Sequence, residues 1–236
     1  MKIRSDSPKN MPPLRKVEQF LPPLPHGVKT FRWCNRSAKW SGLRLPTVTE
    51  PSRTGNIVHY QGFGWPMAEY LLRKSLANRD ADAAVFELAS AGTHVDDGAE
   101  MDPRTVQQLV RLNVSPNGFR YHTVTAHDLD DADLILTATR AQRSMLLERL
   151  PTALRRSFTL LEFAQTAQLV RSCQTDIGAP KDLVRLSAVA RGSVPVPEYD
   201  VADPVGGSVR VHRRNADVTL EAVQAISGAL VRQFPN

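Results

Sequence analysis

Few side chains in this sequence could do covalent or acid–base chemistry, and they lie far apart. Cys34 and Cys173 carry the only thiols, and neither has a companion at metal-ligand or redox spacing. His59 could form a phosphohistidine, and Arg53 could hold an anion without attacking it. Asp203 precedes a proline in a loop that also holds two glycines. The ordinary interpretations are incidental thiols, a solvated histidine, an exposed arginine and a turn aspartate, so none of these residues establishes a reaction alone.

From Pro66 onward, helix-like and strand-like patterns alternate, which is typical of a parallel α/β sheet. Short strands are predicted at residues 84–90, 132–138 and 157–160, and helices at 67–77, 102–112, 140–150, 161–170, 181–190 and 217–234. Apolar spacing predicts the buried helix faces, which include Val106, Leu109 and Val110, then Leu183, Leu186 and Val189, and finally Val218, Ala222, Ala225, Ile226 and Leu230.

The charge of the chain divides it into two parts. Residues 1–50 hold 10 Lys and Arg against 3 Asp and Glu, together with 7 of the 17 prolines, which leaves 20 against 21 for the rest. We predict a basic, proline-rich, largely disordered tail at 1–50 and one folded domain at 51–236. The tail lacks the aromatic–basic interleaving of nucleic-acid binders, so nucleic acid is not the expected partner.

Composition also limits the expected partners and cellular compartment of the protein. No apolar run approaches the roughly 18 to 20 residues of a membrane span, so we expect no membrane partner. Two distant cysteines favour a reducing compartment, and the cytoplasm is the expected one. We expect a monomer with no cofactor and no metal site.

Five sequence blocks occur in an order that matches one known family. They are residues 66–69 (Pro-Met-Ala-Glu), 90–93 with 101–104, 131–136 with 139–140, 158–163 and 199–204. Together they resemble the low-molecular-weight protein-tyrosine-phosphatase family over residues 66–236. The resemblance implies a doubly wound, four-stranded parallel sheet with helices on both faces, and an active-site loop at the carboxyl end of the first strand.

In that family, a loop with the pattern Cys, five residues, Arg wraps the phosphate at a helix N-terminus. The loop amides lower the pKa of the cysteine, whose thiolate attacks phosphorus, and the arginine grips the phosphate oxygens. An aspartate then protonates the leaving group. The resemblance places Asp203 in the position of this general acid.

The loop itself does not match. Residues 54–57 are similar to it, so Gly55 and Asn56 are the predicted remnants of a degenerate phosphate-binding loop. In this alignment Arg53 stands at the nucleophile position and His59 at the arginine position. When the loop is aligned from the helix instead, the arginine falls on Gly64. Neither alignment leaves the cysteine and arginine in place.

The segment expected to form the first strand is also unsuitable. Residues 43–53 contain Arg44, Pro46, Glu50, Pro51 and Arg53, whereas a central parallel strand is normally a continuous apolar run. The first-strand position of the sheet is therefore predicted to be empty or poorly filled.

Several interpretations stay open. The sequence favours a phosphatase-like protein that is inactive because the nucleophile is absent, with residues 1–64 arising from a shifted frame or an altered start. The alternative is a pseudophosphatase that binds a phosphotyrosine protein or another anionic ligand. An active enzyme with an unrecognised nucleophile is the third interpretation.

Overall fold

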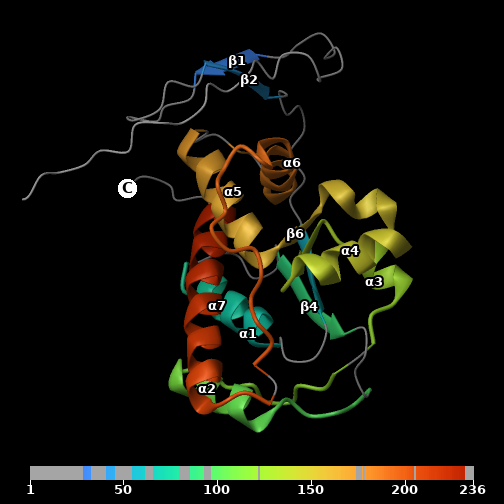
Figure 1. Ribbon diagram of the computed structural model, residues 1–236, viewed down its shortest axis with the longest axis vertical. Helices are drawn as coiled ribbons and strands as arrows, with labels where there is room; N and C mark the ends of the chain where they lie inside the picture. The colour runs from blue at the N-terminus through green and yellow to red at the C-terminus, as the bar shows by residue number, and fades with distance from the viewer. Residues whose placement is uncertain are drawn as a thin grey trace, which may run out of the picture.

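The computed structural model describes residues 29–32, 41–45, 55–61, 66–79, 86–92, 97–121, 123–173, 177, 179–204 and 206–231. A four-stranded sheet lies at the centre of this part of the chain (Figure 1). Its strands are all parallel and run in the order β4 (Phe86–Gly92), β3 (Gly55–Gln61), β5 (Leu134–Thr137) and β6 (Ser157–Thr159). The α/β class and the parallel sheet predicted from the sequence are confirmed.

Strand β3 fills the first-strand position, so the prediction of an empty position is wrong. Ile57 lies in register with Leu88 of β4 and Leu134 of β5, which makes β3 a central strand. The segment from Ile57 to Tyr60 is rich in β-branched and aromatic residues, and this composition favours a strand. The proline-containing segment 43–53 is not part of this sheet where the structure describes it.

Helices cover both faces of the sheet, and alternation along β5 shows this directly. Leu134 and Leu136 pack in the larger apolar core, whereas Ile135 between them packs in a second, smaller core. The larger core lies against α1 (Pro66–Ala77), α2 (Pro103–Arg111), α5 (Leu160–Cys173), α6 (Pro180–Ala190) and α7 (Val209–Leu230). The smaller core lies against α3 (Ala126–Asp130), α4 (Arg140–Arg149) and the short 3-10 helix η3 (Pro151–Arg155).

In two helices a residue predicted to be buried is exposed, and a third helix begins earlier than predicted. Val110 and Val189 were predicted to face inward but are 59% and 43% exposed. The last helix begins at Val209 rather than at residue 217, and Ser208 caps it. Its first turns bury the polar residues His212 and Asn215. Because these buried positions are polar, the amino-terminal part of the helix lacks the apolar spacing that predicts a helix.

The predicted tail contains two described strands, β1 (Lys29–Arg32) and β2 (Ser41–Leu45), which pair antiparallel. The other residues of 1–50 lie outside the described part, so the disorder of the tail stays a prediction. Among the helices that the structure describes, none is both long and apolar enough to cross a membrane.

Candidate active site

The loop at residues 198–204 lies at the carboxyl end of β5, where doubly wound folds place their ligands. The backbone N–H of Val201 donates to the carbonyl oxygen of Ala138 at 2.9 Å, and Ala138 directly follows β5. Val201 is 3% exposed and Pro204 is buried, whereas Asp203 is exposed. Buried residues therefore hold this loop against the sheet while its candidate acid remains accessible. We call residues 198–204 the acid loop.

Arg140 joins the acid loop to the first turn of α4. Its backbone N–H donates to Oδ1 of Asp200 at 2.8 Å, and its Nε lies 3.4 Å from the same oxygen. Its guanidinium carbon lies 5.2 Å from the centroid of the Tyr199 ring, within cation–π distance. The Arg140 side chain is still 63% exposed, so its remaining donors can reach an anionic group that approaches the loop.

Two further side chains hold the backbone on either side of Asp203. Asn215, in the second turn of α7, donates from Nδ2 to the carbonyl oxygen of Ala202. Arg104, in the first turn of α2, donates from Nη1 to the carbonyl oxygen of Gly207. Asn215 is 7% exposed, so its contact with the loop is a buried one. The acid loop is thereby fixed by α7 as well as by β5, and α2 holds the segment that follows it.

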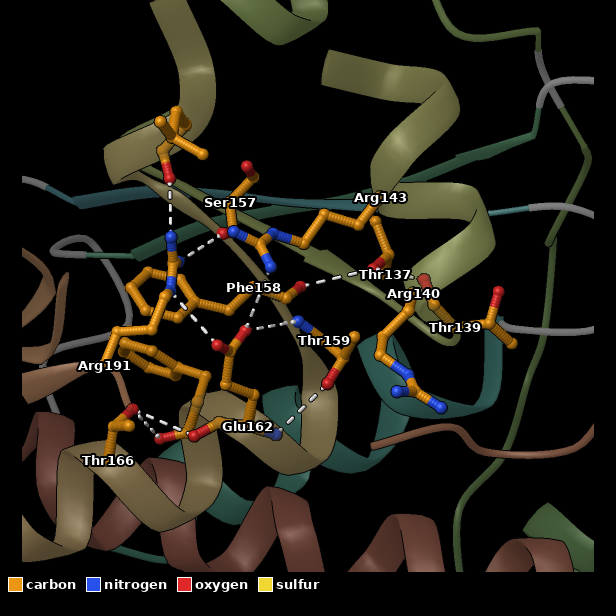
Figure 2. A network of polar contacts seen from close by, with 12 residues as sticks. Thr137, Thr139, Arg140, Arg143, Ser157, Phe158, Thr159, Glu162, Thr166 and Arg191 are labelled. Carbon is orange, nitrogen blue, oxygen red and sulfur yellow. Dashed lines mark hydrogen bonds and ion pairs between the residues drawn. The ribbon is translucent and has the colours of Figure 1, made fainter. Parts of the chain in front are cut away.

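A buried carboxylate, Glu162, lies further along the same edge of the sheet, in the first turn of α5 (Figure 2). Its side chain is 4% exposed, with Oε1 at 3.1 Å from Nε of Arg191 and Oε2 at 3.7 Å from Nη1 of Arg143. Thr159, the last residue of β6, donates its N–H to Oε2 at 3.4 Å. Its Oγ1 accepts from the N–H of Glu162 at 3.2 Å.

Arg191 completes this network from the end of α6 (Figure 2). It donates to the carbonyl oxygens of Leu154 at 3.0 Å and Ser157 at 2.7 Å, and its guanidinium carbon lies 4.2 Å from the centroid of the Phe158 ring. Burial lowers the pKa of Arg191, and the charge of Glu162 opposes this effect. These contacts tie α5, α6 and β6 together, so the network supports the carboxyl edge of the sheet mechanically.

Gly55 and Asn56, the predicted remnants of a phosphate-binding loop, are strand residues in the structure. They begin β3 and lie in register with Phe86 and Glu87, the first residues of β4. The acid loop is attached at the carboxyl end of β5, whereas Gly55 and Asn56 lie at the amino end of β3. The seven residues of β3 span about 20 Å between these two edges of the sheet. The structure therefore does not bring Gly55 and Asn56 together with Asp203.

The connection from β3 to α1 is short. Strand β3 ends at Gln61 and α1 begins at Pro66, so the connection is the sequence Gly62, Phe63, Gly64 and Trp65, which lies outside the described residues. A loop with the pattern Cys, five residues, Arg needs seven residues. The connection has neither this length nor these residue types.

The other predicted reactive residues are Cys173, His59, Cys34 and Arg53, and the structure describes the first two. Cys173 ends α5, about 20 Å along the helix axis from the start of α5 at the sheet edge. His59 lies within β3, opposite Ser90 of β4. Cys34 and Arg53 are outside the described residues. Within the described part, no group of three or more His, Cys, Asp or Glu residues is arranged to hold a metal ion.

Sequence reasoning missed the residues that hold the acid loop. In the sequence, the pair Thr139-Arg140 stands out only as part of a family block, and Asn215 has no signal apart from being a polar residue near a predicted helix. A capping pattern could have identified the first of these positions. Thr139 caps α4 in a capping box with Gln142, and this cap fixes where Arg140 begins the helix.

Residues 54–187 match the family described as low molecular weight phosphotyrosine protein phosphatase. This match covers more than half of the chain, which therefore belongs to that family. No curated protein matches the sequence.

Solved structures with the same fold include a YwlE mutant from Bacillus subtilis, with 19% identity and a TM-score of 0.56 over 74% of this chain and 97% of that chain. A low molecular weight protein tyrosine phosphatase from T. tengcongensis has 18% identity and a TM-score of 0.54, over 73% and 97%. The YwlE arginine phosphatase from Geobacillus stearothermophilus has 21% identity and a TM-score of 0.53, over 73% and 90%. At these identities the likeness concerns the fold alone.

Proposed function

We propose that this chain has the phosphatase fold of its family but does not carry out the family reaction through a cysteinyl-phosphate intermediate. The observation that carries this proposal is the four-residue connection between β3 and α1. In the family fold, the nucleophile and the phosphate-gripping arginine belong between these two elements. Here the connection is Gly-Phe-Gly-Trp, which supplies neither a thiol nor a guanidinium.

Asp203, the proposed general acid, cannot replace the missing cysteine and arginine. A general acid contributes roughly 10² to 10⁴ in rate by protonating a leaving group, but this contribution requires a nucleophile that attacks phosphorus. Cys173 is remote from the sheet edge, and an arginine at position 53 cannot act as the attacking thiolate. Asp203 is thus proposed as an inherited general acid whose reaction has been lost.

A second proposed function of the carboxyl edge of the sheet is to bind a ligand without hydrolysing it. The exposed Arg140 guanidinium beside the acid loop favours this pseudophosphatase alternative, because guanidinium groups bind phosphate in a bidentate geometry. The ligand would be a phosphotyrosine protein or another phosphorylated or anionic molecule. Solved structures with this fold include both a tyrosine phosphatase and an arginine phosphatase, so the fold does not select the phosphorylated residue. We propose the cytoplasm as the compartment for either use, since the two cysteines are far apart.

The test compares hydrolysis and binding by the full chain. We expect no turnover of p-nitrophenyl phosphate or of a phosphotyrosine peptide above the buffer rate. Turnover that disappears in Cys34→Ser or Cys173→Ser would establish an unrecognised nucleophile and overturn the proposal. Binding of the phosphotyrosine peptide without hydrolysis, weakened by Arg140→Gln, would support the pseudophosphatase alternative. If neither the unmodified chain nor Arg140→Gln binds the phosphotyrosine peptide, the pseudophosphatase alternative is rejected.

A further inference from the structure

Three arginines occupy one exposed face of α7, just after the acid loop. Arg210, Arg213 and Arg214 follow an i, i+3, i+4 spacing, which places them side by side on the helix, and each is exposed. Within the described part of the chain, none of these three side chains makes a hydrogen bond or an ion pair. We call this surface the arginine face.

This arrangement costs stability in the isolated protein. Like charges at this spacing repel, and the first turn of α7, which already carries positive partial charge, contains no acidic residue. The next acidic residue along the face is Asp217, and it is already paired with Arg111 of α2 at 2.5 Å. An approaching anionic group would relieve the repulsion among Arg210, Arg213 and Arg214.

Exposed valines accompany the arginines. Val209 and Val211, on either side of Arg210 in the sequence, are 55% and 41% exposed. On the neighbouring helix α2, Val110 is 59% exposed and precedes the residue that pairs with α7. Figure 1 shows the amino-terminal end of α7 beside α2. Arginine is enriched at protein–protein interfaces, and the exposed valines beside it add apolar surface that a partner can bury.

The charge of the domain argues against a long polyanion at this surface. Outside residues 1–50, the chain carries 20 Lys and Arg against 21 Asp and Glu, so the domain has no overall positive field. A nucleic acid binds through many phosphates along an extended basic surface, which this balance of charges does not favour. A short acidic segment would match the arginine face alone.

We propose that the arginine face docks an acidic segment of a partner protein, in which Asp or Glu side chains lie beside aliphatic ones. Guanidinium groups bind carboxylates in a bidentate geometry, and the valines contact the aliphatic side chains. A partner held there would lie next to the acid loop, because Ser208, the residue that caps α7, follows that loop closely in the chain. This docking does not depend on whether the chain hydrolyses phosphate.

The experiment measures fluorescence anisotropy of labelled probes with the full chain at low salt. The main probe is a synthetic helical peptide of about 16 residues with glutamates at i, i+3, i+4 and i+7 and leucines beside them. A matched peptide has glutamine in place of glutamate, and a single-stranded oligonucleotide is the third probe. We expect saturable binding of the glutamate peptide only, and weaker binding as salt screens the charges.

The variants identify the surface. Arg210→Gln combined with Arg214→Gln is expected to weaken glutamate-peptide binding at least roughly tenfold, and Val209→Ser to weaken it as well. Arg149→Gln combined with Arg155→Gln removes two exposed arginines elsewhere, with the same change in net charge, and should leave binding unchanged. Circular dichroism checks that each variant folds.

Several outcomes would overturn the proposal. Equal weakening by the control pair would show that binding reflects net charge alone. Equal binding of the glutamine peptide, or tighter binding of the oligonucleotide with no effect of Val209→Ser, would exclude an acidic protein segment. Absence of saturable binding of the glutamate peptide below about 1 mM would show that the arginine face is not a docking surface.

Discussion

The backbone nitrogen of Val201 and the carbonyl oxygen of Ala138 are 2.9 Å apart, and the hydrogen bond between them attaches the acid loop to the end of β5. Strand β5, helix α7 and Arg140 hold this loop, and none of them belongs to the connection between β3 and α1. These anchors of the acid loop therefore lie outside the connection in which the family's nucleophile belongs. This arrangement supports the proposal that the acid loop is retained although the phosphate-binding loop is degenerate.

Asn215→Ala should loosen the acid loop. The amide of Asn215 donates to the carbonyl oxygen of Ala202 and is 7% exposed. Loss of one such hydrogen bond costs about 0.5 to 1.5 kcal/mol of unfolding free energy. Urea denaturation should show this loss, and hydrogen exchange should accelerate in residues 199–207. Asn117→Ala, at an exposed position, is the control and should change neither quantity. Unchanged exchange in the loop of the Asn215 variant would contradict its anchoring role.

Glu162→Gln should be strongly destabilising. The carboxylate is 4% exposed and is the anionic partner of Arg191 and Arg143, so its neutralisation leaves two guanidinium groups uncompensated. Removing one partner of a buried ion pair typically costs about 3 to 5 kcal/mol. Glu148→Gln, at an exposed position on α4, should change the unfolding free energy by less than about 0.5 kcal/mol. A similar small effect at both positions would show that the network does not support the sheet edge.

Asp182→Asn should stabilise the protein at neutral pH. The Asp182 side chain is 3% exposed, and its Oδ2 has no hydrogen-bond partner among the described residues. Burial raises the pKa of this carboxyl above its usual value of 3.8, and Arg185 partly opposes this effect. The folded state thus binds the proton more tightly than the unfolded state, so the ionised carboxylate reduces stability at pH 7.

The pH dependence provides the check. The stability difference between Asp182→Asn and the unmodified chain should shrink as pH falls through the raised pKa, and vanish below about 3.8. Asp130→Asn, at an exposed position, should show no such trend. If Asp182→Asn instead destabilises the protein at pH 7, then the interaction with Arg185 outweighs the cost of burying the charge.

Strong local patterns made most of the fold predictable from sequence. The run Leu134, Ile135 and Leu136 is short and wholly apolar, and the structure buries each of these side chains. Asp102 before Pro103 predicted the start of α2, and the Asp102 carboxylate accepts from two backbone N–H groups there. In these elements local propensity and burial agree, so the sequence alone was sufficient.

Two features could not be predicted because different signals competed. Residues 54–57 are similar to a phosphate-binding loop, whereas Ile57, Val58 and Tyr60 have a strand-forming pattern. The first signal predicts a loop where the structure has β3. In α7, His212 and Asn215 are polar but buried, and apolar periodicity does not reveal such positions. The contacts that hold the acid loop join residues far apart in sequence, as Val201 and Ala138 do, and no local pattern identifies them.

Restoring the missing loop should restore hydrolysis. Because β3 already fills the central strand position, a graft needs only to replace residues 62–65 with a loop of the pattern Cys, five residues, Arg, followed by serine. The grafted chain should hydrolyse phosphotyrosine, and Asp203→Ala in that chain should slow turnover by roughly 10² to 10⁴. The loss should be largest for leaving groups of high pKa. An inactive but folded graft, or an unaffected rate in Asp203→Ala, would show that Asp203 is not an inherited general acid.

The most direct test of the central claim is a search for the covalent intermediate itself. The full chain is mixed with a phosphotyrosine peptide, quenched in acid within the first turnover time of an active family member, and analysed by mass spectrometry at Cys34 and Cys173. The absence of a nucleophile between β3 and α1 predicts that neither cysteine carries phosphate, while the loop-grafted chain, treated in parallel, carries it on the introduced cysteine. Phosphate on Cys34 or Cys173 of the unmodified chain would contradict the claim that this protein has lost the cysteinyl-phosphate reaction.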